Sequence, residues 1–587
     1  MWKYQPPLRD MRYVIDEVLS LPERWGHLPA FAELDSQTAA QVLNEAARFA
    51  VDVLAPTNAT GDLQGCTWSP DQVRTPAGFR EAYRIFVQAG WPALACAPQF
   101  GGQGLPQVLN AALFEMLVSA NHAWTMYPGL LHGAYDALRA HASAVVKALF
   151  LDKVVSGEWL ATMCLTEAQA GSDLGLIKTR AESSDAGTFV LTGSKIFISG
   201  GDHDLTDNIV HLVLARLPGG PAGTKGISLF ACPKFMPDGK PNAIRCVGIE
   251  KKMGIKGSAT CAMSFEGATG WLIGEPHRGL AAMFPMMNSA RLHVAIQGLA
   301  HAEASHQNAG RYAVERLQSR VAAPSTPAAG RSSGSQADPI ALQPAMRRKL
   351  LRQRVYVDAS RLMAYEAAHL LDVADYDEDR AQRVKALDHV SLLTPVLKAF
   401  LTANGFQIAS DALQVFGGHG YIHDWGVEQC VRDSRIALIY EGTNEIQAID
   451  LLVRKVLPDG AAKFDELLTY LQDALPSDGE HSVAASRAIA RMRDATHALL
   501  RAAATDAELA FRVADDFLRA MGLVLVVQAW ARCAAVSSRE QHAHDAFHRA
   551  KCDIARHCFD YVLPELEHAL QMISAGGHPL GQLPMPA

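Results

Sequence analysis

The chain has few of the features that mark secreted, membrane-spanning or nucleic-acid-binding proteins. Its ten cysteines are scattered and none forms a Cys-x-x-Cys pair, which argues against a disulfide framework and favours a reducing compartment. No apolar signal sequence opens the chain, and the closest approach to a membrane span, residues 520–527, is too short. The net charge is −7, so no overall positive field attracts nucleic acid. We expect a cytoplasmic protein that neither inserts into a membrane nor binds nucleic acid.

Length and composition are those of an ordinary globular protein. At 587 residues the chain exceeds the size at which a single hydrophobic core usually stops growing, so it should hold several domains or one large multi-layer unit. Hydrophobic residues make up 49% of the chain and charged residues 20%, which is enough apolar surface to build a packed core. Any function must therefore be sought in local motifs.

The character of the sequence changes along the chain. Apolar residues recur at helical spacing at first, then short β-branched runs separated by turn residues take over, and then helical spacing returns. A Pro-, Ala-, Ser- and Gly-rich segment at 322–338 interrupts the second helical part, and we expect it to be a mobile loop. The predicted domains are 1–158 (α-helical), 159–275 (antiparallel β), 276–457 (helical bundle) and 458–587 (extra helical domain).

One glutamate stands out in the segment Tyr440-Glu441-Gly442-Thr443-Asn444-Glu445-Ile446-Gln447, where a turn leads into an apolar helical run. A carboxylate held at the start of a helix, beside backbone N–H groups that lack intrahelical partners, can act as a general base next to an oxyanion-stabilising site. The same carboxylate can instead do no more than complement the helix dipole. On these residues alone both interpretations stand.

Four segments resemble motifs of the acyl-CoA dehydrogenase flavoenzymes and occur in that family's order. They resemble, in turn, its Thr-Glu-x-x-x-Gly-Ser-Asp flavin loop, the strand that packs on the isoalloxazine ring, the Gly-Gly turn that contacts a flavin bound mainly by the neighbouring subunit, and the catalytic-base motif. The segments are Thr166–Asp173, Lys195–Ser199, Gln414–Tyr421 and Tyr440–Gln447.

The resemblance implies an α+β multidomain fold, with an N-terminal helical domain, a middle antiparallel β domain and a C-terminal four-helix bundle. The additional C-terminal helical domain is similar to that of the long form of the family, which includes 3-methylmercaptopropionyl-CoA dehydrogenases and broad-range fatty acyl-CoA dehydrogenases. FAD is implied as cofactor, because no side chain accepts a hydride. Glu441 would take the α proton of an acyl-CoA and the flavin the β hydride, giving trans-2-enoyl-CoA. Burial should raise the pKa of Glu441.

The resemblance also implies residues around the flavin ring. Met163, Leu165 and Thr166 match positions whose backbone and hydroxyl contact the flavin pyrimidine. Phe197 would pack flat on the ring, and Ser199 would donate a hydrogen bond. The alternative interpretations are a turn cap for Thr166 and core packing for Phe197, which is compatible with its packing on the ring.

Other matched positions lie farther along the chain. Arg316, Gln414, Gly417 and Gly418 match the site of the flavin pyrophosphate, which is completed across a subunit boundary, and Thr443 matches a cofactor contact in the base motif. The Phe-Gly step that usually follows the arginine is missing after Arg316, which puts the flavin contacts of this corner in doubt.

Three residues match the substrate side. Ser172 matches a residue that lines the route of the acyl-CoA chain, and Arg291 matches an arginine that contacts the CoA arm. Asn288 stands where aspartate is common; its amide can still hydrogen-bond a pantetheine amide, but the charge is lost. A solvated helix charge is the alternative interpretation of Arg291.

The resemblance further implies a homodimer and an electron-transfer flavoprotein as the oxidant. Two alternatives stay open: an acyl-CoA oxidase that uses oxygen, and a flavin-binding homologue without dehydrogenase activity that acts in DNA association. The latter would want a basic patch, which the interleaved charges of the last domain do not offer. No metal is expected at His542, His544 and His548, because no acidic or thiol ligand is expected to complete a set with them, and a polar helix face is the favoured interpretation.

Overall fold

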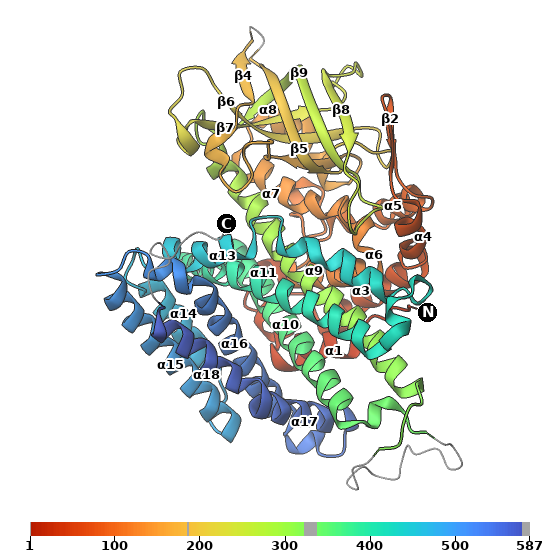
Figure 1. The fold of residues 1–587 in the computed structure, drawn as a ribbon. Helices are drawn as coiled ribbons and strands as arrows, with labels where there is room; N and C mark the ends of the chain where they lie inside the picture. The colour runs from red at the N-terminus through yellow and green to blue at the C-terminus, as the bar shows by residue number, and fades with distance from the viewer. Residues whose placement is uncertain (1, 185–186, 322–336, 578–587) are drawn as a thin grey trace, which may run out of the picture. The chain divides into compact units, whose positions relative to one another are not determined.

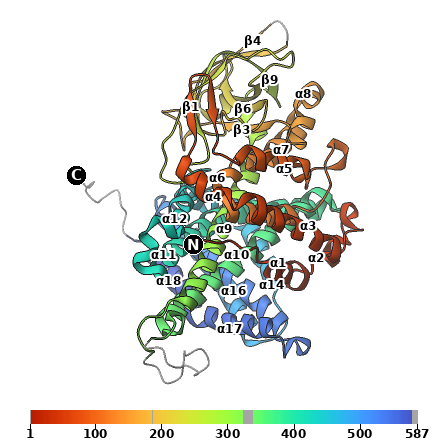
Figure 2. The same ribbon diagram turned by 90° about the vertical axis from the view of Figure 1, so that its right-hand side faces the viewer.

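The computed structural model describes residues 2–184, 187–321 and 337–577 and divides into two compact units. One unit is Asn44–His293, and the other joins Met1–Leu43 to Val294–Ala587. Helices α3 (Ser36–Arg48) and α9 (Gly279–Glu315) cross the boundaries between the units. Figures 1 and 2 show helices at both ends of the chain and a sheet of strands between them in sequence, so the predicted fold class is confirmed. The division into four domains stays a prediction.

In the unit Asn44–His293 the chain forms helices before it forms the sheet. These helices are α4 (Thr57–Gln64), α5 (Phe79–Gln88), α6 (Gln107–Thr125), α7 (Leu131–His141) and α8 (Ala144–Val155). A small hairpin interrupts this part, which the sequence predicts to be wholly helical: β1 (Thr67–Ser69) pairs antiparallel with β2 (Gln72–Arg74). The reason is local, because Pro70-Asp71 forms the tight turn between them.

Seven strands form one sheet in this unit. They are β3 (Leu160–Cys164), β4 (Arg180–Ser183), β5 (Phe189–Ser199), β6 (Ile209–Arg216), β7 (Ile227–Pro233), β8 (Ile244–Ile249) and β9 (Thr260–Ile273). β6 pairs with β7, β7 with β9, β9 with β5, β5 with β4 and β4 with β6, so the sheet closes on itself. It differs from the expected antiparallel sheet where β3 runs parallel to β6 and where β4 meets β6.

Strand β5 carries a bulge near its end. Lys195 pairs with Met263 and Ile198 with Cys261, so the two residues between them on β5 face a single residue of β9. One of the two, Phe197, has a φ of 59°, and its side chain is 59% exposed. The bulge therefore turns a large aromatic side chain out of the sheet instead of into the core.

Long helices make up the other unit. In addition to α9 they are α10 (Pro344–Tyr376), α11 (Arg380–Phe416), α15 (Glu480–Ala503) and α16 (Leu509–Ser537). The shorter helices are α1 (Leu8–Arg12), α2 (Leu21–Trp25), α12 (Val427–Ser434), α13 (Asn444–Ile449), α14 (Ala462–Asp473), α17 (Ala546–Tyr561) and α18 (Leu563–Ala575). Helix α16 packs against α10, α11 and α13, so the extra C-terminal helices share a core with the bundle.

Helix α16 is long and apolar enough to cross a membrane by length and composition. However, 89% of its most apolar window is buried inside the protein. Its neighbours include α15, α17 and α18, which cover it with apolar faces of their own. Burial of this kind is what the central helix of a globular helical domain shows.

Buried charges join three distant parts of this unit. The Lys551 Nζ lies 2.6 Å from Asp10 Oδ1 and 2.6 Å from Asp358 Oδ2. Arg354 donates to the same two carboxylates. These charged residues come from α1, α10 and α17. Each buried charge is paired only when the three helices pack in this one arrangement.

The loop predicted at 322–338 lies outside the described residues except for its last two. One of those, Asp338, is 1% exposed and accepts a hydrogen bond from the backbone N–H of Val321 at 3.0 Å.

Candidate active site

Two residues singled out by the motifs adopt strained backbone conformations. Among the described residues seven non-glycine residues have positive φ, and Phe197 and Glu441 are two of them. Such a conformation costs about 1–3 kcal/mol and persists only where the surroundings hold it in place. The contacts that hold these two residues thus show how each part of the site is built.

Glu441 lies in the turn before α13, within the helical unit. Its φ is 56°, and Gly442 follows with a φ of 85°. The Gln447 side chain donates from Nε2 to the Glu441 carbonyl at 3.0 Å, and Thr443 caps α13 by accepting from the Ile446 backbone N–H. The helix that follows the glutamate thus reaches back and fixes the turn that presents it.

The side chain of Lys398 also holds this turn in place. It lies on α11 and is 0% exposed. Its Nζ donates to the Gly442 carbonyl at 2.7 Å and to Asn444 Oδ1 at 3.0 Å. A buried ammonium is costly unless its donors are satisfied, so these bonds tie the turn firmly to α11.

Tyr440 precedes the glutamate and keeps its proton. Burial, and next the negative charge of Glu441, raise the pKa of Tyr440. Its hydroxyl donates to Gln297 Oε1 on α9. A neutral tyrosine on one side and the Lys398 bonds on the other leave little freedom for the backbone at Glu441.

In the sheet-containing unit, the flavin-loop motif is locked to the bulge of β5. Lys195 Nζ lies 2.8 Å from Glu167 Oε1 and 3.0 Å from the Leu165 carbonyl. The Thr166 carbonyl accepts from the Ile196 N–H at 2.9 Å. Loop and bulge are therefore held at a fixed spacing.

Glu167 is the centre of this local network. Besides Lys195 it accepts from the backbone N–H groups of Lys178 at 2.6 Å and Thr179 at 3.0 Å. Burial alone would raise its pKa, but the Lys195 ammonium and these hydrogen bonds outweigh burial and lower the pKa of Glu167 to about 2. The carboxylate stays ionised and organises the loop.

The surface next to this network fits a flat heteroaromatic group. The exposed Phe197 ring offers one face for stacking. The Thr166 hydroxyl, half-buried, makes no hydrogen bond within the described part of the chain, so it is free to bond a ring heteroatom. Met163 and Leu165 precede Thr166 in sequence, and Ser199 ends β5 beyond Phe197. The five residues predicted around a flavin ring thus lie near the ends of β3 and β5, in segments that the Lys195 contacts hold together.

The residues predicted for the substrate lie in the same unit. Ser172 is exposed in the loop after Thr166, while Asn288 is exposed and Arg291 half-buried on α9. Ser172 therefore lies on a different element from Asn288 and Arg291.

The residues predicted for the pyrophosphate lie in the helical unit. Gln414, Gly417 and Gly418 are exposed where α11 ends, and the glycines face open space. Near the end of α9, Tyr312 stacks on Phe416 with ring centroids 4.2 Å apart. This contact brings the exposed Arg316, one turn after Tyr312, to the end of α9 next to the end of α11. Thr443 instead belongs to the turn of Glu441, where its hydroxyl caps α13.

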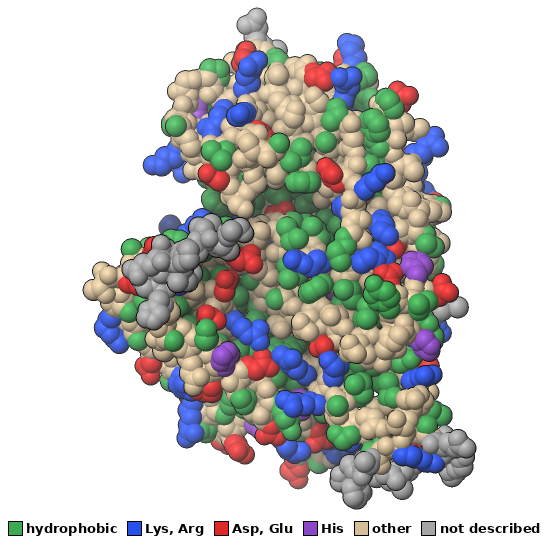
Figure 3. Space-filling view, viewed as in Figure 1, with side chains coloured by type: hydrophobic (Ala, Val, Ile, Leu, Met, Phe, Trp, Pro, Cys, Tyr) green, Lys and Arg blue, Asp and Glu red, His purple; other side chains and the backbone are tan. Residues whose placement is uncertain are grey.

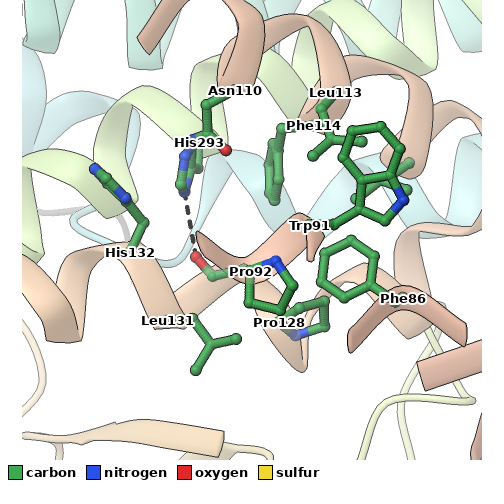
Figure 4. Close-up of a pocket in the computed structure, with 12 residues that line it drawn as sticks. Phe86, Trp91, Pro92, Asn110, Leu113, Phe114, Pro128, Leu131, His132 and His293 are labelled. Carbon is green, nitrogen blue, oxygen red and sulfur yellow. Dashed lines mark hydrogen bonds between the residues drawn. The ribbon is translucent and has the colours of Figure 1, made fainter. Parts of the chain in front are cut away.

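Figure 4 shows a cavity in the sheet-containing unit, lined by residues of α5, α6 and α7 and by His293 of α9. Its volume is about 30 Å³, room for about one water molecule. The His293 ring stacks on Phe114 at 4.3 Å, and its Nδ1 lies 3.2 Å from the Gly129 carbonyl. Burial lowers the pKa of His293 to about 4, so the neutral ring donates from Nδ1 to the Gly129 carbonyl at the wall of a cavity that Asn110 and His132 also line.

One expectation from the sequence is wrong. A carboxylate does lie beside His542 and His548: it belongs to Glu17, near the other end of the chain. Sequence reasoning could not find it, because only the packing of the first helices on the last ones brings the three together.

Sequence reasoning also assigned no role to Lys195, Glu167 or Lys398. The sequence does hold a clue for Lys398, which is the one charged residue in the apolar run Val396–Leu401. A lysine buried in such a run is expected to have a hydrogen-bonding or charged partner. Lys195 and Glu167 stood inside the quoted motifs, but nothing in the sequence pairs them.

Family models match most of the chain. "Acyl-CoA dehydrogenase, middle domain" matches residues 162–268, "Acyl-CoA dehydrogenase, C-terminal domain" matches 277–456, and "Acetyl-CoA dehydrogenase C-terminal like" matches 464–584. The chain is 39% identical to 3-methylmercaptopropionyl-CoA dehydrogenase of Ruegeria pomeroyi, over 88% of this chain and 89% of that protein. It is 32% identical to the broad-specificity linear acyl-CoA dehydrogenase FadE5 of Mycobacterium tuberculosis, over 81% and 79%.

Solved structures share the fold. The structure of Caenorhabditis elegans ACDH-11 in complex with C11-CoA aligns with a TM-score of 0.78 at 18% identity, covering 98% of this chain and 96% of that one. An acyl-CoA dehydrogenase from Bacillus anthracis complexed with FAD aligns with a TM-score of 0.74 at 19% identity, over 94% and 91%.

Proposed function

The chain belongs to the acyl-CoA dehydrogenase family, and from this premise we propose that Glu441 is the base of an FAD-dependent α,β-dehydrogenation of an acyl-CoA. The observation that carries the assignment is the strained turn of Glu441, held by Lys398 and Gln447. Thr443 already caps α13, so the helix does not need Glu441 as a cap. A strained and supported turn at Glu441 therefore favours the role of base.

The reaction divides into a proton and a hydride. Glu441 removes the α proton of the thioester and keeps it, while the acyl chain loses a hydride from the β carbon and becomes trans-2-enoyl-CoA. FAD, when bound, supplies the hydride acceptor. The Glu441 backbone N–H polarises the thioester carbonyl and so makes the α proton more acidic.

Separate residues bind the cofactor and the substrate in this proposal. Thr166 bonds the flavin pyrimidine together with the backbone at Met163 and Leu165, Phe197 stacks on the ring, and Ser199 adds a donor. Thr443 contributes from the base motif. The pyrophosphate is held by Arg316, Gln414, Gly417 and Gly418, and the acyl-CoA by Ser172, Asn288 and Arg291. The rigid loop and bulge around Lys195 support the ring assignments, since a stacking surface must be pre-organised.

Several properties of the whole protein follow as proposals. The relatives reported above are named dehydrogenases, which favours an electron-transfer flavoprotein over oxygen as the oxidant. A homodimer is supported by Tyr421 and Ile422, which are 83% and 52% exposed directly after the Gly-Gly turn. All ten cysteines are free thiols, which supports a reducing cytoplasm. The burial of the apolar helix α16 supports a protein that does not insert into a membrane.

A role in DNA association has less support. The face of the molecule in Figure 3 shows basic and acidic side chains interspersed, with no continuous basic surface on that face. The net charge of −7 points the same way.

Anaerobic titration of the purified flavoprotein with a panel of acyl-CoA thioesters tests the function. We expect at least one saturated acyl-CoA to bleach the flavin and to yield its trans-2-enoyl product in equal amount. Rapid reoxidation by air alone, with hydrogen peroxide formed at each turnover, would indicate the oxidase instead. A protein that binds no FAD would refute the proposal, and light scattering showing a flavin-loaded monomer would refute the dimer alone.

A further inference from the structure

Two histidines and a glutamate from opposite ends of the chain meet in the helical unit, away from Glu441 in sequence. Glu17 comes from the segment Tyr13–Val18, His542 from the turn Glu540–His542, and His548 from α17, which Figures 1 and 2 label. One ligand atom from each side chain lies within 4.8 Å of the other two.

The separations are close to those of a metal site. Glu17 Oε2 lies 3.4 Å from His548 Nε2 and 3.8 Å from His542 Nε2. Zinc bonds of about 2.0–2.1 Å in a tetrahedron place neighbouring ligand atoms about 3.4 Å apart. A shift of a few tenths of an ångström would therefore let all three atoms reach one ion.

The ligand atoms are also in a suitable chemical state. Glu17 Oε2 is buried and has no hydrogen-bond partner within the described residues. Because the nearby Arg9 guanidinium can only donate, His548 Nε2 presents a lone pair to it. The two imidazole rings stack with centroids 3.7 Å apart, and a rotation about the broad χ2 torsion would turn their lone pairs toward one point.

Other groups face the cluster, and one of them is a cation. An Arg9 nitrogen lies 3.2 Å from His548 Nε2, and Arg9 also pairs with Glu17. The Asp545 carboxylate lies 3.8 Å from His548 Nε2, Gln541 donates to His542 Nε2 at 3.1 Å, and Ser537 Oγ lies 3.3 Å from His548 Nδ1. Arg9 is 49% exposed, so it can leave, and Asp545 is within reach as a fourth ligand.

We propose that Glu17, His542 and His548 bind a zinc ion, and that Arg9 holds the site as a tethered cation until the metal displaces it. Two imidazole nitrogens and a carboxylate are a ligand set that suits zinc, whereas magnesium and calcium prefer oxygen ligands alone. The ion would clamp the first segment of the chain onto the last helical domain.

Zinc binding to the FAD-loaded, full-length protein without a histidine tag tests this. After dialysis against a chelator, isothermal titration with zinc chloride should show one site per chain above any weak background, and cobalt(II) in its place should give the visible absorption of a tetrahedral site. Glu17→Gln and His542→Asn should each weaken zinc binding at least about tenfold, since even an indirect contact to a metal ligand is worth that much. His544→Asn is the matched control, because His544 is exposed beside the cluster and outside it, and it should bind zinc like the parent.

Arg9→Gln separates the metal site from a mere polar cluster. Removing the competing cation should tighten zinc binding, whereas a purely structural Arg9 would leave zinc binding unchanged. Zinc should also raise the thermal midpoint of the parent more than that of Glu17→Gln. A parent that binds no zinc after chelation, or Glu17→Gln and His542→Asn variants that bind it as tightly as the parent does, would overturn the proposal.

Discussion

Lys195 and Glu167 form a buried ion pair whose partners are 0% and 5% exposed, with 2.8 Å between Nζ and Oε1. Lys195 also donates to the Leu165 carbonyl, and the neighbouring Ile196 N–H donates to the Thr166 carbonyl. Together these bonds set the distance between the flavin loop and the bulge that carries Phe197. The ion pair is therefore a positioning device of the proposed ring site.

Replacing one partner of this pair should strongly destabilise the folded protein. Lys195→Met leaves the Glu167 charge buried without its ammonium, which typically costs about 3–5 kcal/mol. We expect a lower thermal midpoint and weaker FAD binding, and we expect Lys195→Met with Glu167→Gln together to recover part of the stability, because no charge is then left unpaired. Lys178→Met is the control, since its exposed side chain is absent from the network. A single variant as stable as its parent would contradict this account.

Glu441→Gln should abolish the proton abstraction and little else. The amide keeps the size of the side chain but cannot accept the α proton, so the rate of flavin bleaching by substrate should fall at least about 10²-fold. FAD content and acyl-CoA affinity should remain near those of the parent. Glu445→Gln, an exposed glutamate in the same motif, is the control and should bleach normally. Near-parental bleaching in Glu441→Gln would return Glu441 to the role of a helix-dipole carboxylate.

Lys398→Met tests whether the strained turn matters. Methionine fills the same volume but cannot donate to the Gly442 carbonyl or to Asn444. Glu441 should then sample more backbone conformations, so the bleaching rate should fall about tenfold or more while FAD binding is retained. Lys385→Met, exposed on the same helix, is the control. If the bleaching rate is unchanged, Lys398 contributes to stability alone.

Stability should fall in acid because buried carboxylates have lowered pKa values. Glu167 titrates at about 2 in the folded protein against an ordinary 4.5, so it stabilises fully above the unfolded value and loses this contribution as pH falls toward 2. In the helical unit burial opposes ionisation of Glu366, but Arg24 and Arg532 outweigh it and lower its pKa as well. The thermal midpoint should therefore drop progressively between about pH 5 and pH 2.

The matched comparison uses two glutamine variants. Glu167→Gln should show a shallower dependence of the thermal midpoint on pH than the parent. Glu182→Gln, at an exposed glutamate of β4, should follow the parent curve. Identical slopes for parent and Glu167→Gln would exclude Glu167 as a source of the acid sensitivity.

The sequence by itself determined the family and the order of helical and β parts, and it singled out Glu441 as the candidate base. These features are local. The spacing of apolar residues over a few turns indicates a helix or a strand, and a motif such as Tyr440–Gln447 is recognised from adjacent residues. The bulge at Phe197 was not evident in this way, because it depends on the register between β5 and β9.

Only the tertiary structure decided which distant residues support the site. Lys398 reaches the carbonyl of Gly442, which lies 44 residues away, and Lys195 reaches Glu167 across 28 residues. Glu17 meets His548 only because the first and last helices pack together. Such contacts depend on how whole helices and strands dock, and the free energy of docking is spread over many side chains that no local pattern records.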